Sequence, residues 1–150
     1  MSSKKPIDFL KSLAQALNFD LGDPKSLETE TNFEITIQEN PITIVFESRE
    51  NRPSRVIFCS SLGNTPEHLR GRLATLFLEA NHLWSATMDA TVSMNGDTGE
   101  ALMAHQLLTD GLTSESFINE FLIFAEAHQQ WKLLLTDLCL PLAENTGLPV

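Results

Sequence analysis

The sequence predicts an α+β domain with the element order α-β-β-β-α-β-β-α. Between residues 33 and 60 the segment FEITIQ alternates apolar and polar side chains, and ITIVFE and RVIFCS are further short runs rich in β-branched and aromatic residues, which is typical of strands. Near the start, the middle and the end of the chain, apolar residues recur instead at three- and four-residue spacing, which is typical of amphipathic helices. Asn95-Gly96, between two further apolar runs, has the composition of a hairpin turn.

The first helix is predicted to begin at Pro6, because proline suits the first turn of a helix. Its apolar stripe consists of Ile7, Leu10, Leu13, Ala14 and Leu17. The segment NFDLGDP then interrupts the helical spacing and ends the helix.

A three-stranded antiparallel meander is predicted next. In its first strand Phe33, Ile35 and Ile37 alternate with polar residues, and Asn40-Pro41 is expected to turn the chain into the segments ITIVFE and RVIFCS. One side of the meander must cover the core and the other is free for a partner. The pattern alone leaves open which alternate set of the middle strand faces outwards.

A second helix is predicted from Thr65, as the N-cap, and Pro66 to about residue 83. One face carries Leu69, Leu73, Leu76, Phe77 and Ala80. Ala74 and Leu78 fall on nearly the opposite face at 100° per residue. A helix with two apolar faces needs two partners.

The stretch DATVSMNGDTGE, residues 89–100, has oxygen-bearing side chains at several positions of an EF-hand calcium loop. It lacks the glycine that this loop needs at its sixth position, where Met94 stands. The residues from Trp84 to Met94 alternate strictly, and 101–108 is a second run of strand length. We therefore predict a β-hairpin with solvated carboxylates and no metal site.

The longest helix is predicted to start at Thr113 or Ser114. Its apolar stripe is Phe117, Phe121, Phe124, His128, Trp131 and Leu135. We place a single domain at 1–136 and expect 137–150, with two prolines and a glycine, to be a flexible tail.

Composition narrows the function classes. Ten Lys and Arg residues against twenty Asp and Glu give a net charge of −10, which opposes binding to nucleic acid and to anionic membranes. The start of the chain lacks the apolar run of a signal peptide, and no apolar run reaches membrane-spanning length. Two cysteines without metal spacing are expected to be reduced thiols, so we expect a cytoplasmic protein.

Catalytic and cofactor motifs are missing from the sequence. No P-loop, GxGxxG, HExxH or nucleophile elbow occurs, and the four histidines share no motif. Arg49, Arg52 and Arg55 surround one loop without interleaved aromatic residues, which is typical of a solvated turn. These observations predict a protein that is not an enzyme and needs no cofactor.

The element order, the acidic charge and two local stretches resemble the class I type III secretion chaperones of the CesT/SycE type, the Tir chaperone family. The stretches are LGNTPEHLRGRLATLFLEANHLWSATMDATVSMNGDTGEALMAHQLL and FINEFLIFAEAHQQWKLLL, and the likeness covers about residues 6 to 136. The resemblance implies a homodimeric bacterial chaperone, active without ATP and linked to virulence. Such a chaperone binds the N-terminal region of a secreted effector in extended form and presents it to the secretion machinery, with the secretion ATPase as a further possible partner.

The resemblance also implies two sets of site residues. The dimer interface maps onto Leu69, Leu73, Leu76, Phe77, Leu78, Ala80, Trp84, Met88 and Val92. Client contacts map onto Leu13, Leu17, Phe33, Ile35, Ile42, Ile44 and Phe46. For each residue the alternative is a place in the hydrophobic core.

Two other functions compete with this one. A small α+β binding or regulatory module would hold an apolar ligand or a protein partner in a cavity between sheet and helices. An enzyme would bring two of the histidines and a carboxylate together in one cleft.

Overall fold

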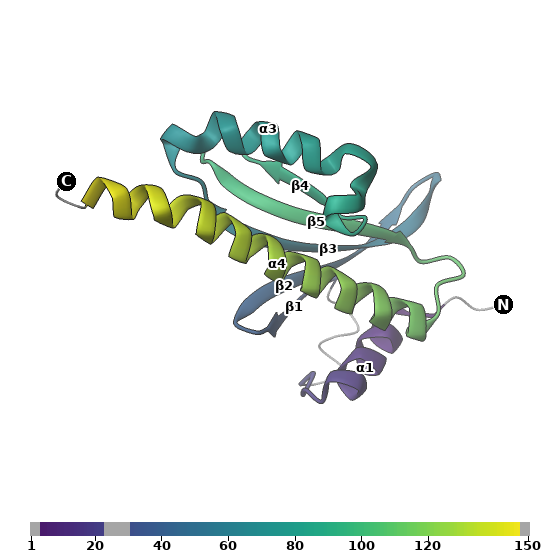
Figure 1. Cartoon of the computed structure of the whole chain (residues 1–150). Helices are drawn as coiled ribbons and strands as arrows, with labels where there is room; N and C mark the ends of the chain where they lie inside the picture. The colour runs from purple at the N-terminus through teal and green to yellow at the C-terminus, as the bar shows by residue number, and fades with distance from the viewer. Residues whose placement is uncertain (1–3, 23–30, 148–150) are drawn as a thin grey trace.

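The structure is a computed structural model that describes residues 4–22 and 31–147 (Figure 1). Its elements confirm the predicted α+β class and order. They are α1 (Pro6–Leu17), β1 (Asn32–Ile37), β2 (Asn40–Arg49), β3 (Arg52–Asn64), the 3-10 helix η1 (Glu67–Leu69), α3 (Arg70–Asn81), the 3-10 helix η2 (His82–Thr87), β4 (Thr91–Met94), β5 (Glu100–Leu108) and α4 (Ser114–Gly147).

The five strands form one antiparallel sheet in the order β1-β2-β3-β5-β4. β1, β2 and β3 are the predicted meander, and the β4–β5 hairpin joins the free side of β3. α4 crosses one face of the sheet, with α1 against its N-terminal part and α3 near β4 and β5 (Figure 1). α3 and α4 also contact each other, and the ring centroids of Phe77 and Trp131 lie 6.0 Å apart.

The core lies between the sheet and α4, and its centre is aromatic. The Phe58 ring of β3 lies 5.4 to 5.8 Å from the rings of Phe117, Phe121 and Phe124 of α4. All six residues of the predicted α4 stripe are buried. The N-cap is Thr113, whose hydroxyl oxygen accepts the Ser116 N–H at 3.0 Å.

One helix is longer than expected, and one predicted turn lies elsewhere. α4 continues to Gly147, through most of the segment 137–150 that we expected to be a flexible tail, and half-buried Cys139 extends its contact with the core by one more turn. The first hairpin turns at Gln38-Glu39, both with positive φ, and not at Asn40-Pro41. Asn40 is instead a buried residue of β2. Its side-chain oxygen accepts a hydrogen bond from Lys132 Nζ of α4 at 2.7 Å, and its side-chain nitrogen donates to Gln129 Oε1.

Thr65 is not the helix cap that we predicted. Its buried hydroxyl donates to the Gly99 carbonyl at 2.6 Å, which ties the end of β3 to the β4–β5 turn. Residues 67–69 form the 3-10 turn η1, and the α-helix begins only at Arg70. A contact with a distant segment has therefore replaced the local cap.

The predicted strand from Trp84 to Met94 is correct only from Thr91 onwards. The preceding residues form η2, in which Leu83 and Trp84 have positive φ, and Met88 and Asp89 continue in that conformation. Distant contacts hold this path, since the Trp131 indole N–H donates to Ala86 O at 3.0 Å. The alternating pattern thus predicted the wrong local structure for 84–90.

The β4–β5 hairpin is confirmed, but its turn differs from the prediction. The Asn95 N–H donates to Glu100 O at 2.8 Å, and the positive φ, +79°, belongs to Gly99 instead of Asn95 or Gly96. Strands and not helices flank this loop, so the EF-hand arrangement is absent from residues 89–100.

Gly99→Ala is expected to lower the free energy of unfolding by about 1–3 kcal/mol. A Cβ at residue 99 would overlap the Arg70 guanidinium, which donates to Thr98 O at 3.0 Å, and its φ would be strained. Gly96→Ala is the matched control, because a Cβ there meets open space and its φ is ordinary. Chemical denaturation of both variants measures the difference, and equal stabilities would contradict the role of Gly99.

Candidate functional site

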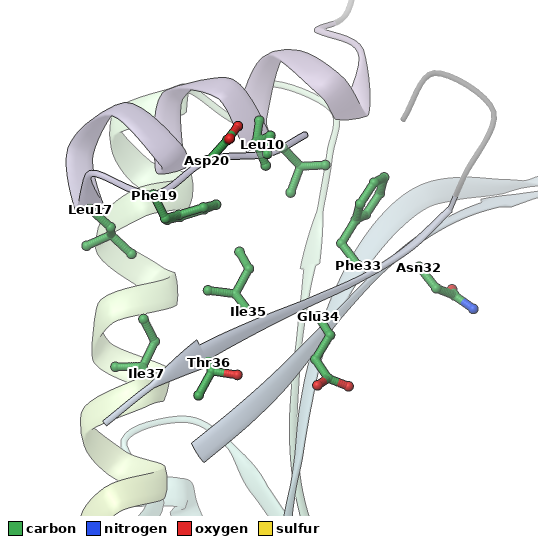
Figure 2. A pocket seen from close by; sticks show the side chains of 11 residues that line it. Leu10, Leu17, Phe19, Asp20, Asn32, Phe33, Glu34, Ile35, Thr36 and Ile37 are labelled. Atoms are coloured by element: carbon green, nitrogen blue, oxygen red, sulfur yellow. The ribbon is translucent and has the colours of Figure 1, made fainter. Parts of the chain in front are cut away.

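A groove of about 420 Å³ lies between α1 and the edge strand β1 (Figure 2). We call it the α1–β1 groove. It is lined by Leu10, Leu17, Phe19, Asp20, Leu21 and all six residues of β1, Asn32, Phe33, Glu34, Ile35, Thr36 and Ile37.

The groove takes its apolar character from both of its walls. Phe33, Ile35 and Ile37 point from β1 towards α1, whereas the alternate side chains of β1 point to the other face of the sheet (Figure 2). At the end of α1, Asn18 adopts a left-handed conformation with φ 57°, which turns the chain back. Phe19 therefore lies over the groove and partly covers it.

The backbone of β1 offers unpaired groups along the groove. The Phe46 N–H donates to Thr31 O at 2.8 Å, so residues 31 and 46 form a hydrogen-bonded pair at the start of the β1–β2 ladder. In an antiparallel ladder, hydrogen-bonded pairs of residues alternate with pairs that share no hydrogen bond. Asn32, Glu34 and Thr36 are at the unbonded positions, so their N–H and C=O groups point away from β2. No described residue accepts from or donates to those groups. β1 can thus pair with an additional strand.

The opposite edge of the sheet, strand β4, is less accessible to an added strand than the β1 edge. β4 has four residues, and the Asn81 side chain bonds both edge-facing groups of Val92, accepting from its N–H at 2.9 Å and donating to its C=O at 2.8 Å. An added strand would have to displace this amide. The β1 edge is therefore the better place for strand addition.

The structure divides the predicted client contacts into two groups. Leu17, Phe33 and Ile35 line the α1–β1 groove as expected for contacts. The remaining four do not line it and are buried in the core: Leu13, Ile42, Ile44 and Phe46. Phe33 and Ile35 are themselves only 8% exposed, so the groove presents the edges of core residues. The open question about β2 is also answered, because Ile42, Ile44 and Phe46 face inwards.

Sequence reasoning missed four apolar residues of the groove: Leu10, Phe19, Leu21 and Ile37. Ile37 belongs to the same alternating set as Phe33 and Ile35, so the period already contained that signal. Phe19 and Leu21 lie in the segment that we treated only as a helix end. Two large apolar residues directly after a helix were the signal for a second wall.

A second surface contains the two most exposed large apolar residues of the described segments, Leu78 and Leu83. We call Leu78, Leu83, Trp84 and Met88, at the end of α3 and in and beside η2, the α3 patch. The exposed fractions of Leu78 and Leu83 are both 74%, and that of Trp84 is 51%. Such a cluster of large apolar side chains is typical of a protein interface.

The predicted dimer residues are split in the same way. Leu78, Trp84 and Met88 belong to the α3 patch, and Leu76 is half-buried. The other five are core residues of the single chain, which is the alternative that the sequence had left open: Leu69, Leu73, Phe77, Ala80 and Val92. The prediction of two apolar faces on this helix is confirmed by the exposure of Leu78 and the burial of Leu73 and Phe77.

Backbone strain contributes to the shape of the α3 patch. Leu83 and Trp84 have φ of 61° and 56°, a conformation that is unfavourable for residues other than glycine. Their side chains nevertheless remain in solvent. Strain that holds apolar side chains outwards is consistent with a surface that is covered by a partner.

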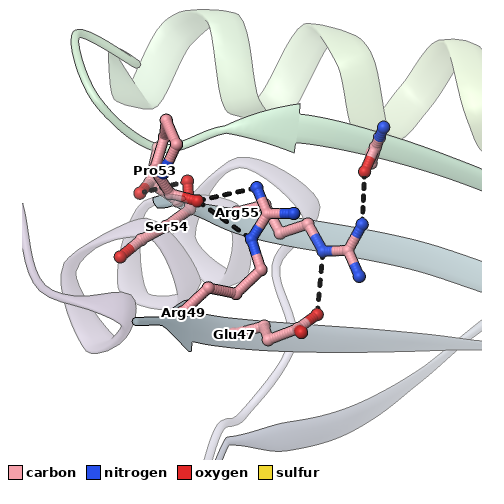
Figure 3. A network of polar contacts seen from close by, with 7 residues as sticks. Glu47, Arg49, Pro53, Ser54 and Arg55 are labelled. Carbon is pink, nitrogen blue, oxygen red and sulfur yellow. Dashed lines mark hydrogen bonds and ion pairs between the residues drawn. The ribbon is translucent and has the colours of Figure 1, made fainter. Parts of the chain in front are cut away.

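Two of the three arginines around the β2–β3 turn, Arg49 and Arg55, have structural partners (Figure 3). Both Nε and Nη2 of Arg49 donate to Pro53 O, at 3.0 and 2.7 Å, and Arg55 Nε donates to Glu47 Oε2 at 2.8 Å. The hydrogen bond from Arg55 holds the pKa of the Glu47 carboxyl below its ordinary value. This arrangement agrees with the predicted solvated turn.

The histidines do not assemble a catalytic cleft in the described part of the chain. His128 is buried, its Nε2–H donates to Ser61 O at 2.7 Å, and burial lowers its pKa. His105 lies 3.1 Å from Asp89 O and 3.3 Å from a Glu120 carboxylate oxygen, without a second histidine in either contact. Over residues 4–22 and 31–139, no three His, Cys, Asp or Glu side chains are grouped as metal ligands would be.

Helices that could cross a bilayer are likewise missing from the described residues, since none combines the necessary length and apolar composition.

Comparison with known proteins gives a family match over most of the chain. A model described as the Tir chaperone protein (CesT) family matches residues 8–132. A comparison with curated proteins gave no match.

Several solved structures share the fold. A chain of the ExsC-ExsE complex has a TM-score of 0.63 at 17% identity, over 86% of this chain and 92% of that one. A chain of the ExoT-SpcS complex from Pseudomonas aeruginosa has a TM-score of 0.59 at 12% identity, over 85% and 98%. A chain of the HopA1-SchA chaperone-effector complex has a TM-score of 0.56 at 13% identity, over 87% and 98%. At these identities the likeness establishes the fold.

Proposed function

The chain belongs to the Tir chaperone protein (CesT) family, and from this premise we propose that it is a type III secretion chaperone for a bacterial effector. It binds the N-terminal region of the effector in extended form and keeps that region soluble and competent for secretion. The HopA1-SchA chaperone-effector complex, one chain of which has the same fold, supports this proposal.

The observation that carries the proposal is the α1–β1 groove with the open edge of β1. An extended effector segment pairs its backbone with Asn32, Glu34 and Thr36. Its alternate side chains then enter the groove beside Phe33, Ile35 and Ile37. Edge pairing supplies affinity for any extended segment, and the apolar walls select the side chains.

The proposed chaperone acts as a homodimer. A second copy covers the α3 patch, so that Leu78, Leu83, Trp84 and Met88 leave water in the assembly. Leu76, half-buried beside α4, lies at the margin of that interface. The core residues of α3 then act indirectly, by holding the helix in place.

The remaining parts of the proposal follow from the family. The protein acts in the bacterial cytoplasm, does not catalyse a reaction, binds without nucleotide or cofactor, and delivers its client to the secretion machinery, with the secretion ATPase as a further partner. Residues 1–136 form the working domain. Its acidic surface keeps the chaperone–client complex in solution.

Hydrogen–deuterium exchange with an N-terminal fragment of the cognate effector tests this function. We expect slower exchange in β1 and at the end of α1 when the fragment is bound, because both walls of the groove become covered. The β4–β5 turn is the internal control and should not change. Protection of neither α1 nor any strand between Phe33 and Ser60 would show that the client binds elsewhere.

A further inference from the structure

Building on the proposed function, we infer that Glu34 makes the α1–β1 groove selective for client segments that carry a lysine or arginine between their apolar residues. The inference rests on strand addition at β1 and adds a rule for the composition of the client.

Glu34 is in the middle of the open edge. Its backbone N–H and C=O are among the groups that point away from β2, so a client residue bonds directly to it. Its side chain is exposed and points to the face of β1 opposite the groove (Figure 2). The client residue paired with Glu34 therefore presents its own side chain on the same face, next to the carboxylate.

The two faces of the added strand meet different chemistry. Side chains on one face enter the apolar groove, and those on the other lie beside Glu34 and its neighbours Asn32, Thr36 and Thr43. This alternation holds for either direction of the client strand. The fitting segment has apolar residues at every second position and a basic residue between two of them.

The charge of Glu34 favours a cation on this face of the added strand. The residues beside it on the same face, Asn32, Thr36 and Thr43, carry no charge. Glu34 forms no ion pair with any residue of the described segments, in contrast to Glu47, which is bound to Arg55. A client lysine opposite Glu34 gains a cross-strand ion pair, and a client glutamate meets a like charge.

Three synthetic peptides test the rule. Each has nine residues and capped ends, with valine, leucine or isoleucine at alternate positions, and they differ only in a central lysine, glutamine or glutamate. For the natural protein we expect affinity in the order lysine, glutamine, glutamate, with about a twofold to fivefold change at each step at low salt, as for other exposed cross-strand pairs. Fluorescence anisotropy of labelled peptides measures the three dissociation constants.

Variants of the chaperone assign the preference to one residue. Glu34→Gln should make the three affinities equal, and Glu34→Lys should reverse their order. Asp97→Asn, in the β4–β5 turn, removes the same charge at a distance from the groove and should keep the original order. High salt should reduce the differences without abolishing binding of the glutamine peptide.

The outcomes separate this inference from the function on which it rests. Equal binding of all three peptides, or an order that Glu34→Lys leaves unchanged, would overturn the role of Glu34 while strand addition stands. Failure of all three peptides to bind would contradict strand addition at β1 and the selectivity together.

Discussion

Leu78→Glu is expected to lower the solution mass of the protein from twice the chain mass of 16.7 kDa to the chain mass itself. Leu78 is 74% exposed in the single chain and belongs to the α3 patch, which we assign to a second copy. Covering a leucine of this kind stabilises an interface by about 1.5–3 kcal/mol, and a buried glutamate adds a cost for the lost hydration of its charge. A two-fold interface contains each substitution twice, so the effect is doubled.

Size exclusion with light scattering at micromolar concentration measures the change. Leu133→Glu is the matched control, since Leu133 is a 56% exposed leucine of α4 outside the α3 patch, and this variant should remain dimeric. Circular dichroism should show that both variants keep the fold. A natural protein that is monomeric under these conditions would remove the dimer from the proposal, and a dimeric Leu78→Glu would place the interface on another surface.

The sequence best predicted the elements whose apolar spacing fits only one kind of secondary structure. The stripe of α4 runs through Phe117, Phe121 and Phe124 at helical spacing, and each of these rings contacts Phe58. The meander was also predicted, because Phe33, Ile35 and Ile37 alternate with polar residues and the next two runs are rich in β-branched and aromatic residues, although its first turn was misplaced. In both cases the local period and the tertiary contacts require the same structure.

The segment 84–90 shows where the period failed. Its residues alternate as in a strand, but the indole of Trp131 binds Ala86 O, and the buried Thr87 hydroxyl, which donates to Ala90 O, stabilises the turn that follows. Trp131 is more than forty positions away in the sequence. Contacts across such a distance decide the conformation, and no short window contains them.

The candidate site was predicted only in part. The first helix and the exposed face of the meander were expected to make the contacts, and of the seven residues expected there Leu17, Phe33 and Ile35 line the α1–β1 groove. The inward direction of Ile42 and Ile44 could not be predicted, because both alternate sets of β2 contain apolar residues. Only the packing of α4 against the sheet makes one set the core.

Thr36→Pro is expected to weaken binding of an effector fragment at least tenfold while leaving the fold intact. Thr36 is opposite Pro41, at a pair where β1 and β2 exchange no hydrogen bond, so proline at 36 removes no bond within the sheet. The lost N–H is one that points to the open edge. Its removal costs the client a hydrogen bond worth about 1 kcal/mol, and the proline ring occupies the position of the client carbonyl, which raises the total above the 1.4 kcal/mol of a tenfold change.

Thr36→Val is the matched control, because valine keeps the N–H and suits a strand, and it should bind the fragment as the natural protein does. Calorimetric titration gives both affinities, and thermal unfolding should show that the two variants are similarly stable.

If Thr36→Pro bound the fragment normally, the client would not pair with the backbone of β1, and the α1–β1 groove would bind only client side chains. If Thr36→Val bound the fragment as weakly as Thr36→Pro, the client would contact the threonine side chain and not the backbone edge of β1. Loss of binding in Thr36→Pro alone is the result that requires strand addition, because the two variants differ at the open edge of β1 in the backbone N–H and in the ring that replaces it.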